Sequence, residues 1–133
     1  MLYFYRGFLL SDLNEIKNLI DGFMNDIKDQ FCEDDLFKIR LVINELIVNS
    51  YEHGNESCKE KKIEVVIMIN EDFIMFKIID EGDGIPAFIP KDFMSDSGRG
   101  LKLVNYLSDE FFVSDNKVTV ILNSNKSGTK HFV

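Results

Sequence analysis

The most unusual chemistry in the sequence is a row of polar residues inside an apolar helical segment. Glu45, Asn49 and His53 recur every four positions, and at about 100° per residue they follow one gently drifting stripe of a helix. Their neighbours are apolar almost all the way round, a pattern typical of a buried helix. A carboxylate buried there would be costly unless a ligand, a cation or water shared the site. The stripe is therefore either part of a ligand site or the solvated edge of the helix.

A second candidate segment is Asp80-Glu81-Gly82-Asp83-Gly84, which follows an apolar strand directly. Residues of these types commonly form a plain turn. A calcium loop is excluded, because the EF-hand pattern needs Asn or Asp where Gly82 stands and Glu where Lys91 stands. In the functional interpretation, Asp80 accepts a hydrogen bond from a ligand amine. Gly82 and Gly84 would then let the backbone approach a flat ring.

A third segment, Gly98-Arg99-Gly100, precedes a predicted helix. Free backbone amides at a helix start can bind phosphate, and Arg99 would add a cation. The segment is not a dinucleotide fingerprint, which would need Gly where Leu103 stands, and it lacks the Walker A ending. A flexible hinge before the helix is the alternative interpretation.

The elements that must position these residues follow from the apolar periodicity. After Ser11 or Asp12 as a cap, apolar residues recur at helical spacing, and alternation then predicts a hairpin turning at Asn70-Glu71-Asp72. The expected elements are a strand at 2–8, helices at 13–31 and 33–53, strands at 63–69 and 73–79, an irregular segment at 81–100, a helix at 101–107, and strands at 111–114, 118–122 and 129–133. We therefore expect an α+β fold, with a mixed, mainly antiparallel sheet covered on one face by helices.

Composition narrows the classes of partner. The 133 residues are enough for a single domain, 1–133, and a net charge of -8 repels phosphate backbones, which disfavours nucleic acid. Cys32 and Cys58 are widely spaced and form no C-x-x-C pattern, so neither a disulfide scaffold nor a zinc site is expected. No apolar stretch is long enough for a membrane span, and residues 1–10 lack the features of a signal peptide. We expect a cytoplasmic protein without membrane association.

The order and placement of the three segments resemble the Bergerat (GHKL) ATPases, which include gyrase, histidine kinases and the bacterial anti-sigma factor serine kinases. Glu45-x-x-x-Asn49-x-x-x-His53-Gly54 is similar to the N box, Asp80-x-Gly82-x-Gly84 to the G1 box, and Gly98-x-Gly100-Leu101 to the G2 box. Gly128-Thr129 resembles the Gly-Thr of the closing strand. The resemblance spans nearly the whole chain and implies the two-layer α/β sandwich of the Bergerat type.

The resemblance also implies the ligands, ATP and Mg²⁺, and a role for each residue. Glu45 would be the catalytic base, Asn49 the metal ligand, and Asp80 the group that recognises the adenine amine. One departure concerns Asp96, which stands where some anti-sigma kinases have Arg, so that Arg99 would take over the phosphate contact. The implied nucleotide-binding residues are Asn49, His53, Gly54, Asp80, Gly82, Gly84, Ile85, Gly98, Arg99, Gly100, Leu101 and Thr129.

Within the family, the short stand-alone form is most similar to the anti-sigma factor kinases. The resemblance therefore implies an ATP-dependent serine/threonine kinase that phosphorylates an anti-anti-sigma factor and sequesters a sigma factor, commonly as a homodimer. Two alternatives stand beside it: a nucleotide-dependent binding module without phosphotransfer, and a purely structural domain whose glycines form turns. Glu45 favours the kinase over the binding module, because a binding module would not need a base at that position.

Overall fold

The computed structural model describes residues 2–54, 58, 60–82 and 99–123, and for residues 53, 54, 99 and 100 it describes the backbone alone. Within these ranges the helices and strands follow one another in the order that the sequence predicts. In chain order they are β1 (Tyr3–Leu10), α1 (Leu13–Ile27), α2 (Glu33–Asn49), the short π-helical turn η1 (Ser50–Gly54), β2 (Lys62–Ile69), β3 (Phe73–Ile79), α4 (Arg99–Leu107), β4 (Glu110–Ser114) and β5 (Lys117–Asn123).

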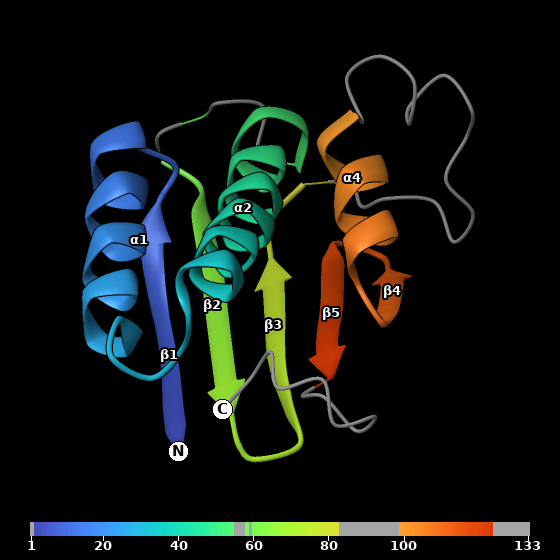
Figure 1. Cartoon of the computed structure of the whole chain (residues 1–133). Helices are drawn as coiled ribbons and strands as arrows, with labels where there is room; N and C mark the ends of the chain where they lie inside the picture. Colours follow the sequence, from blue (N-terminus) through green and yellow to red (C-terminus); the bar gives the residue numbers. More distant parts are fainter. Residues whose placement is uncertain (1, 55–57, 59, 83–98, 124–133) are drawn as a thin grey trace.

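The strands form one five-stranded sheet in the order β1-β2-β3-β5-β4. Every pairing within the described strands is antiparallel, so the parallel component of the expected mixed sheet is not found among them. The expected strand at 129–133 lies outside the described residues. Figure 1 shows α1, α2 and α4 side by side on one face of the sheet. The α+β class with one helical layer is thus confirmed.

The core lies between the helical layer and the inward face of the sheet. Alternate residues of β2 are buried, and α1 buries residues at helical spacing. Phe23 of α1 packs edge-on against Phe76 of β3, with ring centroids 6.0 Å apart. Such a pair adds to the free energy gained from burial alone. Of the helices in the described residues, not one combines the length and apolarity needed to cross a membrane.

Local hydrogen bonds explain where the helices begin and end. Asp12 caps α1, because its Oδ1 accepts the amides of Asn14 at 2.8 Å and Glu15 at 3.3 Å. The helix ends at Ile27 rather than near Phe31, since the next residues are polar and the amide of Gln30 closes a tight turn on the Ile27 carbonyl. In α2 the regular helix ends at Asn49 rather than at His53.

The expectation that α2 is buried all round is wrong. Phe37 is 71% exposed, and Leu41 and Val48 are only half-buried. The helix lies between α1 and α4 and turns one face to solvent, so only the face toward the sheet is fully covered (Figure 1).

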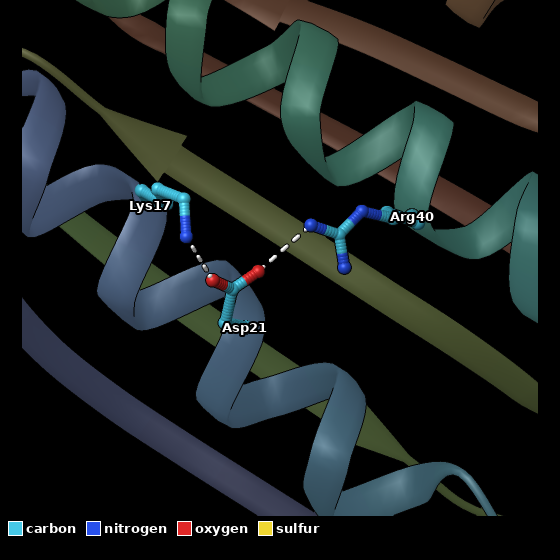
Figure 2. Close-up of polar contacts among 3 residues, drawn as sticks. All are labelled: Lys17, Asp21 and Arg40. Carbon is cyan, nitrogen blue, oxygen red and sulfur yellow. Dashed lines mark hydrogen bonds and ion pairs between the residues drawn. The ribbon is translucent and has the colours of Figure 1, made fainter.

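An ion-pair cluster ties α1 to α2 on the outer surface of the helical layer. The carboxylate of Asp21 contacts Lys17 Nζ at 2.8 Å and Arg40 Nη2 at 2.7 Å (Figure 2). Hydrogen bonds from these two cations lower the pKa of Asp21. All three side chains are well exposed, so solvent screens the pairing strongly.

Candidate functional site

The predicted site residues that the structure describes gather at one end of the molecule. The C-terminal end of α2, the end of β3 and the start of α4 lie together at the same end of the sheet (Figure 1). A side-chain hydrogen bond from Ser50, just after α2, reaches Asp80, just after β3. The N-box helix and the G1 segment, 30 positions apart in the sequence, are therefore in direct contact at this end.

Asp80 is the centre of this arrangement. Its side chain is only 3% exposed, and burial is the largest cause of a raised pKa. Three neighbours oppose that rise: the amide of Gly82, which donates to Oδ1 at 2.8 Å, the hydroxyl of Ser50, and the charge of Lys61. A carboxyl group held by neutral donors in a buried place can accept a further hydrogen bond from a ligand amine.

The backbone of Asp80 is fixed from the other side by Asn116, in the turn between β4 and β5. The Asp80 amide donates to the Asn116 carbonyl at 3.0 Å, and the Asn116 side-chain amide donates to the Asp80 carbonyl. The preceding residue, Asp115, has a φ of 53°, a left-handed conformation that Asp and Asn tolerate better than most residues. The sequence predicts only that the chain turns between the strands at 111–114 and 118–122, because nothing local indicates that Asn116 contacts a residue 36 positions earlier.

The neighbouring carboxylate, Glu81, serves a different structural purpose from Asp80. Its side chain is exposed, and Oε2 accepts the amide of Lys62 at 2.6 Å. Glu81 therefore links the end of β3 to the start of β2. This contact holds the backbone of the G1 segment in position, while Asp80 points inward.

On α2, Asn49 and Glu45 differ in their exposure. Asn49 is the last residue of the helix and only 6% exposed, whereas Glu45, one turn earlier, is half-buried. The polar stripe is therefore not uniformly a solvated edge. An amide oxygen buried beside the Ser50-Asp80 contact is a suitable ligand for Mg²⁺, which prefers one or two protein oxygens and completes its shell with phosphates and water.

The other predicted residues are placed only in part. His53 and Gly54 lie in η1, and Arg99 and Gly100 open α4. The Leu101 side chain is fully buried in the core, so contact with a ligand would have to come from its backbone. Gly84, Ile85, Gly98 and Thr129 lie outside the described residues. In the described part, no three His, Cys, Asp or Glu side chains gather as a metal cluster.

Comparison with known proteins extends this picture beyond the site. A family model for the histidine kinase-like ATPase domain matches residues 12–123. The chain is also similar to proteins named anti-sigma F factor from Bacillus thuringiensis (strain Al Hakam), Bacillus mycoides (strain KBAB4) and Bacillus cereus (strain AH187). Each is 28% identical over 92 residues, which is 63% of this chain and 63% of the relative. The aligned part is thus less than two thirds of those relatives.

The family match runs from the cap of α1 to the last residue of β5, and so includes every element that contributes to the Asp80 site. The resemblance inferred from the three motifs is confirmed, both for the ATPase fold and for the similarity to anti-sigma factors. Because this match covers 112 of the 133 residues, the chain belongs to the histidine kinase-like ATPase family.

Proposed function

We propose that this chain is an ATP-binding anti-sigma factor that transfers the γ-phosphate of ATP to a serine of an anti-anti-sigma factor. The family membership implies ATP binding, and the similarity to anti-sigma F factors supports a sigma factor as partner. The observation that carries the proposal is the buried Asp80 carboxyl, which Ser50 joins to the end of the N-box helix.

In this proposal Asp80 recognises the adenine base of ATP. The amino group of adenine donates to the carboxyl oxygen, while the backbone of Gly82, already bonded to Oδ1, turns the chain away from the ring. Burying a carboxyl group that has only neutral hydrogen-bond donors is unfavourable, and a ligand amine would offset part of that cost. Guanine presents an acceptor at the equivalent position, so Asp80 would favour ATP over GTP.

The phosphates would lie between the end of α2 and the start of α4. Gly98, Arg99 and Gly100 would supply donors and positive charge at the helix start, and Thr129 a further donor. Mg²⁺, when bound through Asn49 Oδ1 and phosphate oxygens, would neutralise the charge that develops on the phosphates.

Glu45 would act as the general base. Its carboxylate takes the proton from the serine hydroxyl of the partner, and the serine oxygen forms a bond to the γ-phosphorus. The bond from that phosphorus to the β,γ-bridging oxygen breaks, and ADP leaves with the bonding electrons. The half-exposed position of Glu45, one turn before the buried Asn49, would let the residue reach both the nucleotide and a protein substrate.

The uncovered face of the sheet supports a homodimer. Alternation along β1 turns Phe4 and Phe8 away from the helical layer, and they are 64% and 59% exposed at this edge of the sheet. Phe112 is 53% exposed on β4, at the opposite edge. Among the described elements, no helix covers this face (Figure 1). Exposed apolar patches commonly mark protein interfaces. We expect Phe4→Ser combined with Phe8→Ser to shift the protein toward monomer in sedimentation, whereas Phe37→Ser on the helical layer leaves the state unchanged.

The remaining parts of the proposal concern setting and partners. A net charge of -8 suits protein partners better than nucleic acid, and we place the protein in the cytoplasm, where sigma factors act. The second candidate function is a nucleotide-dependent binding module of the same fold that holds a regulator without transferring phosphate.

Phosphotransfer is tested with a candidate anti-anti-sigma factor and γ-labelled ATP. We expect Glu45→Gln to lower the single-turnover rate about 10²- to 10⁴-fold, the usual contribution of a general base, with ATP affinity nearly unchanged. Glu33→Gln is the matched control, because it lies at the opposite end of the same helix. Undiminished transfer in Glu45→Gln would remove Glu45 from this role. ATP binding by the wild type without transfer to such partners would favour the binding module.

A further inference from the structure

A second pocket, apart from the nucleotide site, opens between β1 and α1 and has a volume of about 240 Å³. Its lining comes from β1, α1 and Ile67 of β2, whereas Asn49 ends α2 and Asp80 directly follows β3. In Figure 1, β1 and α1 stand at one side of the sheet and α4 at the other. The pocket is therefore distinct from the site described above.

The floor of this pocket is apolar and firmly packed. Phe23 is 3% exposed, Ile67 is fully buried, and Leu19 is packed against the core. The ring of Phe23 lies against both Tyr3, at 5.5 Å between centroids, and Phe76, at 6.0 Å. Such a floor changes little when a ligand binds, so the pocket is preformed.

Gly22 lines the pocket, and Gly7 lies beside the ring of Tyr5, which also lines it. A Cβ added to Gly7 would lie 2.3 Å from the Tyr5 hydroxyl oxygen, so the missing side chain is what lets the Tyr5 ring lie along β1. Gly22 stands in the middle of α1, where glycine is a poor helix former, yet a Cβ there would meet nothing within 4 Å. Packing does not require glycine at position 22. Because glycine has no side chain, it adds no atoms that would fill the pocket from α1.

Polar groups lie at the rim. The Tyr3 hydroxyl donates to Asp26 Oδ2 at 3.1 Å and so fixes the carboxylate beside the opening. Burial, aided by Asp26, raises the pKa of Tyr3 to about 12, and the phenol therefore stays neutral at physiological pH. Asn18 adds an amide on the same helix. The rim thus presents oxygen acceptors, one of which is charged.

Asp26 differs from Asp21, on the same helix, in its pairing with cations. Lys17 and Arg40 both pair with Asp21 (Figure 2). Among the described residues no lysine or arginine pairs with Asp26. A pocket with an acidic rim, in a chain of net charge -8, attracts cations and repels anions.

We propose that this pocket binds a small organic amine with an apolar body. The ammonium group would pair with Asp26 and lie against the Tyr3 or Tyr5 ring, and the body would cover the Phe23 floor. A volume of about 240 Å³ is below the usual range for drug-sized ligands, so the ligand is of the size of an arylalkylamine. This proposal is independent of nucleotide binding and phosphotransfer.

The test uses phenethylamine and 3-phenylpropionate as a matched cation and anion, followed through the backbone amide NMR spectrum of the full chain. We expect phenethylamine to give saturable shifts confined to β1, α1 and the part of β2 around Ile67, and 3-phenylpropionate to give none. Because Asp26 is exposed, Asp26→Asn should weaken the binding of phenethylamine a few-fold. Gly22→Leu, which fills the pocket from a position with room for a side chain, should abolish it.

Asn25→Leu is the control for the leucine substitution, because residue 25 is exposed on the same helix and does not line the pocket. A dispersed spectrum shows that each variant is folded. Equal shifts from the amine and the acid would overturn the proposal, as would shifts centred outside the residues of β1, α1 and β2 that line the pocket. Unchanged binding in Gly22→Leu would also overturn it.

Discussion

Asp80 and Asp21 show how differently one side-chain type behaves in two regions of this molecule. Asp80 is buried at the end of β3, is held by neutral donors, and has a raised pKa. Asp21 lies on the surface of α1, is paired with Lys17 and Arg40, and has a lowered pKa. The charged form of Asp80 is therefore disfavoured by its surroundings, whereas that of Asp21 is favoured.

The difference separates a costly arrangement from a favourable one. An exposed ion pair needs no further explanation, since it joins two helices and lies in water. A buried carboxyl group whose pKa is raised by burial lowers the free energy of unfolding at neutral pH. Such a cost is commonly found where the group has a role in binding or catalysis. Perturbed groups of this kind are concentrated at functional sites, and Asp80 is for this reason the position where a substitution should affect nucleotide binding most.

The largest effect is expected from Asp80→Asn on ATP affinity. The change removes the charge that accepts the adenine amine, and hydrogen bonds to charged groups contribute about 1.5–3 kcal/mol, or roughly 10- to 100-fold in affinity. Preference for ATP over GTP should shrink too, because the amide of Asn can also donate. Calorimetric titration with both nucleotides measures this. If Asp80→Asn bound ATP as tightly as the wild type, Asp80 would not be the residue that recognises the adenine amine.

A smaller effect is expected from Asn116→Ala. The substitution removes the side-chain donor to the Asp80 carbonyl but keeps the backbone bond between the two residues. We expect the free energy of unfolding to fall by about 0.5–1.5 kcal/mol and the ATP affinity to fall a few-fold. Asn25→Ala on α1 serves as the control at an exposed position. A loss of stability with unchanged ATP affinity would mean that Asn116 supports the fold without positioning Asp80.

Asn116 also marks the limit of what the sequence predicts. The Asp80 segment, the α2 stripe and the α+β class follow from local periodicity and motif spacing, since both depend on neighbouring residues. The bonds from Asn116 and Ser50 to Asp80 depend on how distant elements pack, and no local pattern encodes that. The exposed Phe37 was missed for the same reason, because an apolar helix does not reveal which of its faces the sheet will cover.

The pH dependence of stability should have a definite sign at Asp80. Its folded pKa lies above the usual value of 3.8, so the folded state holds the proton more tightly than the unfolded state does. Its contribution is therefore favourable at low pH and is lost as pH rises from about 3.8 through the folded value. Chemical unfolding of wild type and Asp80→Asn across this range isolates the contribution. A wild type that gained stability over the variant with rising pH would contradict the assigned cause.

The smallest effect, and one of opposite sign, is expected from Asp21→Asn. The folded pKa of Asp21 lies below 3.8, so its contribution is present above that value and is lost as pH falls through the folded value. Because the three side chains are exposed, the change in unfolding free energy at neutral pH should be smaller than that of Asn116→Ala and should diminish as salt is added. Nucleotide affinity should not change. Parallel denaturation curves at low and high salt measure the effect. If Asp21→Asn destabilised the protein more than Asn116→Ala, the exposed ion pairs between α1 and α2 would contribute more to the free energy of unfolding than solvent-screened pairs usually do. That result would contradict the assigned difference between the two carboxyl groups.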